Sequence, residues 1–138
     1  MTEQFPFLPV SAGRGDSFLM PMLPLSLSFK GGELAHIHGL IDSGATVNVL
    51  PYSLGIRLGA VWEAQTTLVK LTGNLATQEA RALLAEARVG GFDPVKLVFA
   101  WTRSDSVPLL LGQVNFFEEF NVSFRRAQRV FEIDSVGK

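Results

Sequence analysis

The chain is 138 residues long, carries a formal net charge of −1 and contains no cysteine. That length predicts a single domain, residues 1–138, with enough material for a hydrophobic core. The near-neutral charge gives no electrostatic reason to expect a nucleic-acid or acidic-membrane partner. The lack of cysteine excludes disulfides, thiol nucleophiles and cysteine-based metal sites.

Hydrophobic residues make up 47% of the chain and charged residues 18%, whereas soluble domains usually have about 25% charged residues. This apolar surplus indicates an additional surface to bury, such as a subunit interface. No apolar run reaches the roughly 18 residues of a membrane span, so we expect no membrane insertion by this segment. We also expect no secretory signal. The cytoplasm is therefore the default localisation, unless the domain is cut from a larger or membrane-anchored protein.

The first segment, residues 1–18, is rich in proline, glycine and serine and shows no sustained period. We expect an extended N-terminal arm or loop there, with a short strand near Phe5–Val10. A flexible lead-in is the alternative.

A hairpin is predicted next. Leu25–Phe29 alternates apolar and polar residues, as a half-buried strand does. The Lys30–Glu33 turn contains paired glycines, which allow the positive φ angles of a tight hairpin turn. Its return strand, Leu34–Ile41, ends directly at Asp42.

Asp42 is an acidic residue between two apolar runs, with Ile41 before it and Val47 to Leu50 after it. An unpaired carboxylate is costly to bury, so the chain must present it on a loop. Ser43 and Gly44 supply a hydroxyl and a residue without Cβ, which lets the backbone bend sharply. The sequence therefore predicts one carboxylate raised from a hydrophobic strand on a tight loop.

The centre of the chain is predicted to contain one short helix, three strands and their turns. These are a helix over Tyr52–Leu58 ended by Gly59, a strand over Thr66–Leu71, a turn over Thr72–Leu75, a strand over Ala80–Val89, a turn at Gly90-Gly91, a strand over Val95–Trp101 and a polar loop over Thr102–Val107. Residues 80–89 are rich in helix formers. The glycine pair and the strand after them nevertheless favour a hairpin partner there.

The last third begins with Pro108–Gly112, a short apolar strand that ends in glycine. Gln113–Phe120 has apolar residues at helical spacing and predicts a short amphipathic helix. Val122–Phe124 and Val130–Ile133, separated by an arginine-rich turn, predict a closing hairpin.

Asp42-Ser43-Gly44-Ala45 in a strand–loop setting resembles the active-site motif of retropepsin-like aspartic proteases. Leu110-Leu111-Gly112, followed by a helix and a hairpin, is similar to that family's C-terminal block. The resemblance implies a mostly β fold, a closed barrel or sandwich with one short C-terminal helix that acts as a two-fold homodimer. It also implies an aspartic endopeptidase, a hydrolase that cuts extended polypeptides without a cofactor or a metal.

The resemblance assigns roles to positions of this chain. Asp42 matches the catalytic aspartate, Ser43 the hydroxyl residue that locks the two loops across the dyad, and Gly44 the residue whose carbonyl meets the substrate. The residues expected to bind substrate are Ala45, Thr46, Gly73, Asn74, Leu75 and Leu111. Thr46 stands where retroviral enzymes carry an acidic residue. The flap, a mobile hairpin in the family, is expected over Leu71–Ala76.

Aspartic peptidases need two carboxylates, one ionised and one protonated. The chain has four Asp-Ser pairs, beginning at Asp16, Asp42, Asp105 and Asp134, and Gly follows only the second of them. Because no repeat duplicates the Asp42 environment, we expect the second carboxylate to come from another copy of the chain. A dimerisation or peptide-binding module with little cleavage is the alternative function.

Two other groups of residues are candidates for different chemistry. His36 and His38 share a strand face, but a third metal ligand is not evident, so we interpret them as surface histidines. Arg125, Arg126 and Arg129 have no accompanying aromatic platform, and we interpret them as a solvated turn.

Overall fold

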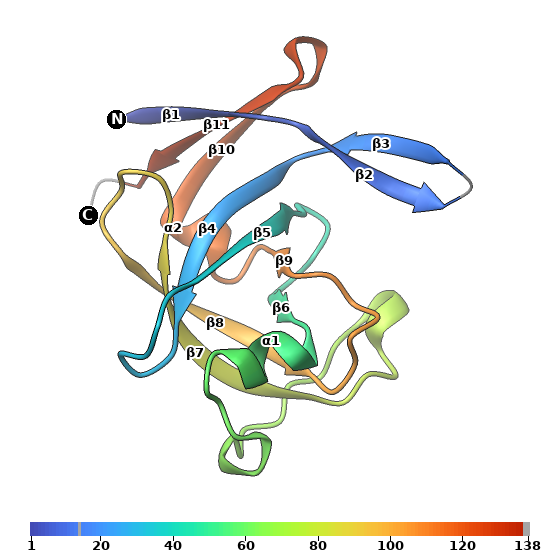
Figure 1. The fold of residues 1–138 in the computed structure, drawn as a ribbon, viewed down its shortest axis with the longest axis vertical. Coiled ribbons are helices and arrows are strands. Elements are labelled where there is room, and N and C mark those ends of the chain that lie inside the picture. The colour runs from blue at the N-terminus through green and yellow to red at the C-terminus, as the bar shows by residue number, and fades with distance from the viewer. Residues whose placement is uncertain (14, 137–138) are drawn as a thin grey trace.

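The structure is a computed structural model that describes residues 1–13 and 15–136, so one position of the predicted N-terminal arm and the last two residues lie outside the description. Figure 1 shows the arrangement of its elements. The strands are β1 (Thr2–Pro6), β2 (Leu8–Gly13), β3 (Asp16–Met20), β4 (Met22–Ser28), β5 (Ala35–Ile41), β6 (Asn48–Leu50), β7 (Ala80–Arg88), β8 (Val95–Thr102), β9 (Leu110–Leu111), β10 (Phe120–Arg125) and β11 (Val130–Ser135). The helices are α1 (Tyr52–Arg57) and α2 (Phe116–Glu119), with 3₁₀ turns η1 (Trp62–Ala64), η2 (Gly73–Leu75) and η3 (Arg126–Gln128). Neither α-helix of the described chain has the length and apolar character needed to cross a membrane.

Six strands close a barrel in the order β4-β5-β9-β6-β8-β7, which confirms the predicted mostly β, closed-barrel fold class. In β4, Leu23, Leu25 and Leu27 are buried while the residues between them are more exposed. This is the alternation expected of a strand with one face on a core. The segment whose composition favours helix is strand β7, because its pairing with β8 over eight residue pairs outweighs local propensity.

The β4–β5 hairpin pairs Met22 with Leu40 at its open end and Leu27 with Ala35 near its turn. At the turn, the N–H of Gly32 donates to the carbonyl of Phe29 over 2.9 Å. The positive φ angles fall on Lys30 and Gly31, at 50° and 73°, one residue earlier than the glycine pair suggests. The predicted hairpin is otherwise confirmed.

Two predicted elements differ from the structure: one predicted strand is absent and one predicted helix is shorter. Thr66–Leu71 is not a strand, since its only pairing is an isolated bridge between Leu68 and Arg81. Two backbone hydrogen bonds, from Val69 to Ala80 and from Ala82 to Thr67, hold the segment antiparallel to the start of β7 at this bridge. The predicted Gln113–Phe120 helix is shortened to α2, because the N–H groups of Gln113 and Val114 bind the carbonyls of Ala45 and Thr46.

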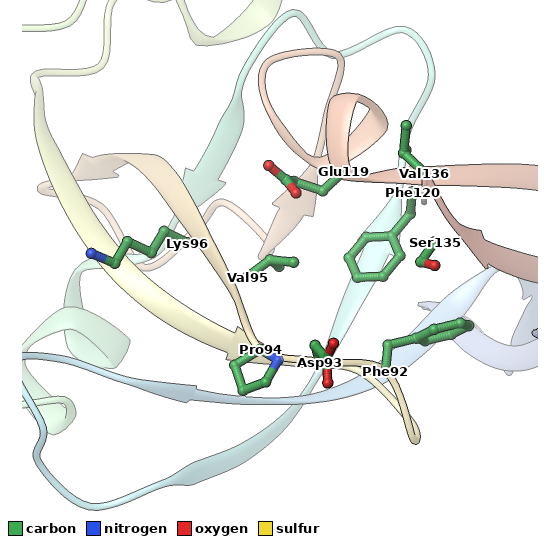
Figure 2. A pocket seen from close by; sticks show the side chains of 9 residues that line it. All are labelled: Phe92, Asp93, Pro94, Val95, Lys96, Glu119, Phe120, Ser135 and Val136. Atoms are coloured by element: carbon green, nitrogen blue, oxygen red, sulfur yellow. The ribbon is translucent and has the colours of Figure 1, made fainter. Parts of the chain in front are cut away.

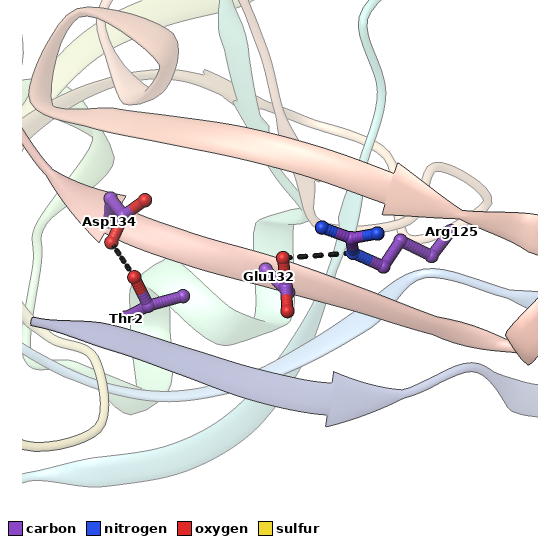
Figure 3. A network of polar contacts seen from close by, with 4 residues as sticks. All are labelled: Thr2, Arg125, Glu132 and Asp134. Carbon is purple, nitrogen blue, oxygen red and sulfur yellow. Dashed lines mark hydrogen bonds and ion pairs between the residues drawn. The ribbon is translucent and has the colours of Figure 1, made fainter.

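The N-terminal residues, expected to form an extended arm, form β1 and the β2–β3 hairpin. β1 lies along β11 in a sheet of order β1-β11-β10, outside the barrel. Figure 3 shows two side-chain contacts of this sheet. The hydroxyl of Thr2 donates to Asp134, and the Nε of Arg125 donates to Glu132 over 2.9 Å. The sheet therefore joins the two ends of the described chain.

The barrel core continues under α1 into an aromatic cluster. Tyr52 and Trp101 stack at 5.7 Å between ring centroids, and Trp62 meets Trp101 edge-on at 5.1 Å. The indole N–H of Trp101 donates to the carbonyl of Tyr52 over 3.1 Å. Gly55 of α1 faces this ring so closely that a Cβ there would lie 2.2 Å from the Trp101 ring atoms.

We predict that Gly55→Ala destabilises the protein by about 1–3 kcal/mol, because overpacking outweighs the gain of up to ~1 kcal/mol that alanine normally brings to a helix. Urea unfolding measures the change. Arg57→Ala, an exposed position of the same helix, is the control and should shift stability by only about 0.5 kcal/mol or less. A Gly55→Ala protein as stable as the wild type would contradict the close packing of α1 on Trp101.

Candidate active site

The Asp42 loop is positioned by a strand from the far end of the sequence. β9 lies between β5 and β6, pairing in parallel with Leu40 and Ile41 and antiparallel with Val49. The N–H of Asp42 donates to the carbonyl of Leu111 over 3.0 Å. The chain therefore leaves β5, forms the loop above β9 and returns on its other side as β6.

The loop folds back on the Asp42 carboxylate. Oδ1 accepts a hydrogen bond from the N–H of Gly44 at 2.9 Å, and the carbonyl of Asp42 accepts one from Ala45 at 3.1 Å. A Cβ at position 44 would lie 3.3 Å from Oδ1, so glycine gives the carboxylate room for this contact. Within the described chain no donor reaches Oδ2. One oxygen is thus held by the loop while the other is available to a ligand.

The segment after β9 forms the floor of the loop. The N–H groups of Gln113 and Val114 donate to the carbonyls of Ala45 and Thr46, each at 2.9 Å. The side-chain amide of Gln113 donates to the carbonyl of Ser43 at 2.7 Å. Gly112 permits this approach, because a Cβ there would lie 2.5 Å from the carbonyl oxygen of Val47. The Leu-Leu-Gly motif therefore supports the loop through backbone contacts.

A cleft of about 440 Å³ lies between this loop and the η2 turn. It is lined by Leu40, Asp42, Gly44, Ala45, Thr46, Val47, Val49, Leu71, Thr72, Gly73, Asn74, Leu75, Pro108 and Leu110. Among the described residues of this lining, Asp42 is the only charged one. The other lining residues are apolar or small and polar, so the carboxylate is the one strong electrostatic feature of the cleft.

The structure brings most of the sequence-selected residues together. Asp42 and Gly44 line the cleft with Ala45 and Thr46 from the loop and with Gly73, Asn74 and Leu75 from η2. Ser43 is exposed on the same loop. Leu111 lies elsewhere, because it is fully buried in the main core, and its neighbour Leu110 faces the cleft instead.

The predicted flap region covers the cleft as an irregular segment. At its base, the N–H of Val69 donates to Ala80 and the N–H of Ala82 donates to Thr67. At its tip, η2 begins at Gly73, whose φ of +63° favours glycine. Leu71 is buried in a small apolar cluster with Val49 and Leu110, so the flap segment is anchored by hydrophobic contact as well as by backbone bonds.

Sequence reasoning missed a polar residue below the loop. Asn48 follows the loop as the first residue of β6 and is fully buried. Its Oδ1 accepts a hydrogen bond from the N–H of Gly112 at 2.8 Å. The available signal was an amide within the apolar run Val47 to Leu50, since a buried polar side chain requires partners.

The remaining candidates do not converge on a second site. His36 and His38 are exposed, and the described residues include no group of three or more His, Cys, Asp or Glu placed to hold a metal. A separate cavity of about 360 Å³ lies where the start of β8 meets the ends of α2 and β11. Figure 2 shows its lining, which is Phe92, Asp93, Pro94, Val95, Lys96, Glu119, Phe120, Ser135 and Val136. No residue of the Asp42 loop contributes to it.

Two of the other Asp-Ser aspartates have structural partners. Asp134 accepts the hydroxyl of Thr2, and Asp105 accepts the N–H of Ser53 at 2.7 Å, at the start of α1. Hydrogen bonds from the backbone and then the side chain of Ser53 lower the pKa of Asp105 below its ordinary 3.8. These aspartates therefore act in structure, and Asp42 is the aspartate that faces the cleft.

The lowered pKa of Asp105 predicts a pH-dependent contribution to stability. Because its native pKa lies below the unfolded value, the ionised form stabilises the protein above pH 3.8, and this contribution is lost as the pH falls through the native pKa. Asp105→Asn should therefore lower Tm at neutral pH, and the difference from wild type should shrink in acid. Asp16→Asn, an exposed aspartate before serine, is the control. A Tm difference for Asp105→Asn that grows on acidification would contradict this assignment.

A closed barrel that presents an Asp-Ser-Gly loop to a cleft is the arrangement expected of an aspartic protease. Residues 25–114, well over half of the chain, match the family described as Aspartyl protease. The chain belongs to this family. Its fold is similar to that of solved retropepsin-like proteases.

A retropepsin-like aspartic protease from Rickettsia conorii aligns with a TM-score of 0.59 and 17% identity, covering 96% of this chain and 92% of the other. The EIAV protease complexed with the inhibitor HBY-793 aligns with a TM-score of 0.52 and 16% identity, covering 79% and 92%. Comparison with curated proteins gives no match.

Proposed function

We propose that the chain is an aspartic endopeptidase that hydrolyses peptide bonds as a two-fold homodimer. The observation that carries the proposal is the single carboxylate in the cleft, with Oδ1 of Asp42 held by Gly44 and Oδ2 turned to no protein donor in the described chain. Membership of the aspartyl protease family supports it.

The chemistry requires a second carboxylate beside Asp42. In a symmetric dimer the two Asp42 loops meet at the axis, and two like charges a few ångströms apart cannot both ionise easily. The ionised member accepts a proton from water as the water attacks the scissile carbonyl, and the protonated member donates to the carbonyl oxygen. Ser43, which is exposed on the loop, would hydrogen-bond with the partner loop in such a dimer.

The form of the cleft suits an extended peptide. The loop supplies one wall and η2 the other, and apolar side chains such as Val47, Leu71 and Leu110 line the space between them. A peptide in extended conformation would bind by main-chain hydrogen bonds and place alternate side chains in these apolar pockets. Closure of the flap segment would exclude water other than the nucleophile.

We expect Asp42→Asn to abolish casein cleavage at about pH 5, a range typical of a shared-proton dyad, with a loss of at least ~10²-fold because general acid–base catalysis is removed. The substitution keeps the size of the side chain. Asp105→Asn, outside the cleft, should retain activity under conditions where it is folded. If wild type and Asp42→Asn are equally inert, the chain is a binding or dimerisation module.

Mixing inactive and active subunits tests the shared site. In an exchanged mixture where wild-type subunits are about one quarter of the total, only about one sixteenth of symmetric dimers carry two Asp42 residues. Activity should therefore fall with the square of the wild-type fraction. A linear fall would mean that each chain carries a complete site and would overturn the homodimer mechanism.

A further inference from the structure

The polar groups below the Asp42 loop form a connected clamp that starts at Asn48. This side chain uses both ends of its amide: Oδ1 accepts from Gly112, and Nδ2 donates to the carbonyl of Val98 at 3.0 Å and to Oδ1 of Asn115 at 3.3 Å. Its own N–H donates to the carbonyl of Val114 at 3.1 Å. A fully buried amide with this many partners specifies one arrangement of its neighbours.

Asn115 is the second member of the clamp. It occupies the residue before α2, where asparagine usually caps the helix, yet its side chain makes no cap hydrogen bond. Instead, Oδ1 accepts from the N–H of Val98 at 3.0 Å and Nδ2 donates to the carbonyl of Lys96 at 2.9 Å. The side chain of Asn115 therefore hydrogen-bonds to β8 and leaves the start of α2 without a side-chain cap.

The position on β8 explains this arrangement. β6 pairs with β8 only from Phe99 to Trp101. Before that point this edge of β8 has no neighbour among the described strands, and the amide of Asn115 binds Lys96 and Val98 as a neighbouring peptide group would. The clamp therefore ties the floor segment to the β7–β8 hairpin, and the floor segment in turn holds the carbonyls of the Asp42 loop.

We propose that Asn48 and Asn115 are positioning residues, which hold the Asp42 loop at the height and angle at which two loops can meet across a dimer axis. Neither residue lines the cleft, so their effect passes through Gly112, Gln113 and Val114. The catalytic consequence rests on the proposed function, whereas the mechanical consequence, a fixed loop, does not.

Asn115→Ala and Asn48→Ala are the test variants. Thr102→Val is the control. Thr102 is also fully buried, and its hydroxyl bonds to the carbonyls of Leu50 at 3.2 Å and Ser104 at 2.9 Å, neither of which belongs to the loop or its floor. At a temperature where each variant is folded, the clamp variants should lower kcat by up to about 100-fold with little change in KM, as expected for a misplaced reacting group. The control should lose stability without this drop in kcat. Equal effects on all three would overturn the proposal.

Amide hydrogen exchange tests the clamp even if no protease activity is found. We expect the N–H groups of Gly44, Ala45, Gln113 and Val114 to lose protection in the clamp variants but not in Thr102→Val. Unchanged protection would overturn the proposal whatever the activity, whereas lost protection without wild-type activity would reject only the proposed function. If Asn48→Ala fails to fold, Asn115→Ala carries the same test from a half-buried position.

Asn115→Asp is a conservative variant that should restore the hydrogen bond to Lys96 only when its carboxyl is protonated. A protonated carboxyl can donate to the carbonyl of Lys96 as the amide does, but an ionised one cannot. Protection of the loop amides should therefore approach that of wild type in acid and fall once the carboxyl ionises, at a pH above the ordinary titration of aspartate, because the hydrogen bond to Lys96 favours the protonated form. Protection that is the same in both pH ranges would argue against the hydrogen bond to Lys96 as the working contact.

Discussion

The candidate site depends on backbone hydrogen bonds between the segment after β9 and the carbonyls of the Asp42 loop. A loop that leaves one strand and returns in another has carbonyls without strand partners, and these backbone groups need other hydrogen-bond donors. Gln113 and Val114 supply the donors. The contact is possible only because Gly112 has no Cβ to meet the carbonyl oxygen of Val47. Gly112, which in the sequence marks only the end of a strand, thus allows the segment after β9 to contact the Asp42 loop.

This support has an electrostatic consequence. With its carbonyls bound by the segment after β9, the loop turns the N–H of Gly44 to the carboxylate of Asp42. In the part of the chain that the structure describes, no other charged side chain lines the cleft. A negative group held by a neutral, partly apolar environment interacts strongly with any charge or proton brought next to it. The arrangement is suited to pairing with a second carboxylate, which is the basis of the proposed mechanism.

The terminal sheet stands apart from this machinery. β1 is hydrogen-bonded along one edge to β11 of the same chain. The N-terminal strand therefore has a pairing partner without a second subunit. Composition indicated more apolar surface than one core needs. Part of it remains exposed at Phe18 of β3 and Leu68 of the flap segment, at 61% and 73% of full exposure. These positions lie outside the barrel, on the hairpin and on the covering segment.

The sequence by itself determined most of the hairpins and singled out Asp42, the acidic residue that faces the cleft. Alternating apolar residues and glycine turns specify the β4–β5 and β7–β8 hairpins, because strand period and turn chemistry act between neighbours in the chain. Tertiary structure alone decided the insertion of β9 between β5 and β6, the truncation of α2 and the use of Asn115 on β8. These features join residues as much as 70 positions apart, as with Gln113 and Ser43. Their hydrogen bonds satisfy backbone groups that lose their water partners only when the barrel forms. No local pattern of residues therefore predicts these bonds.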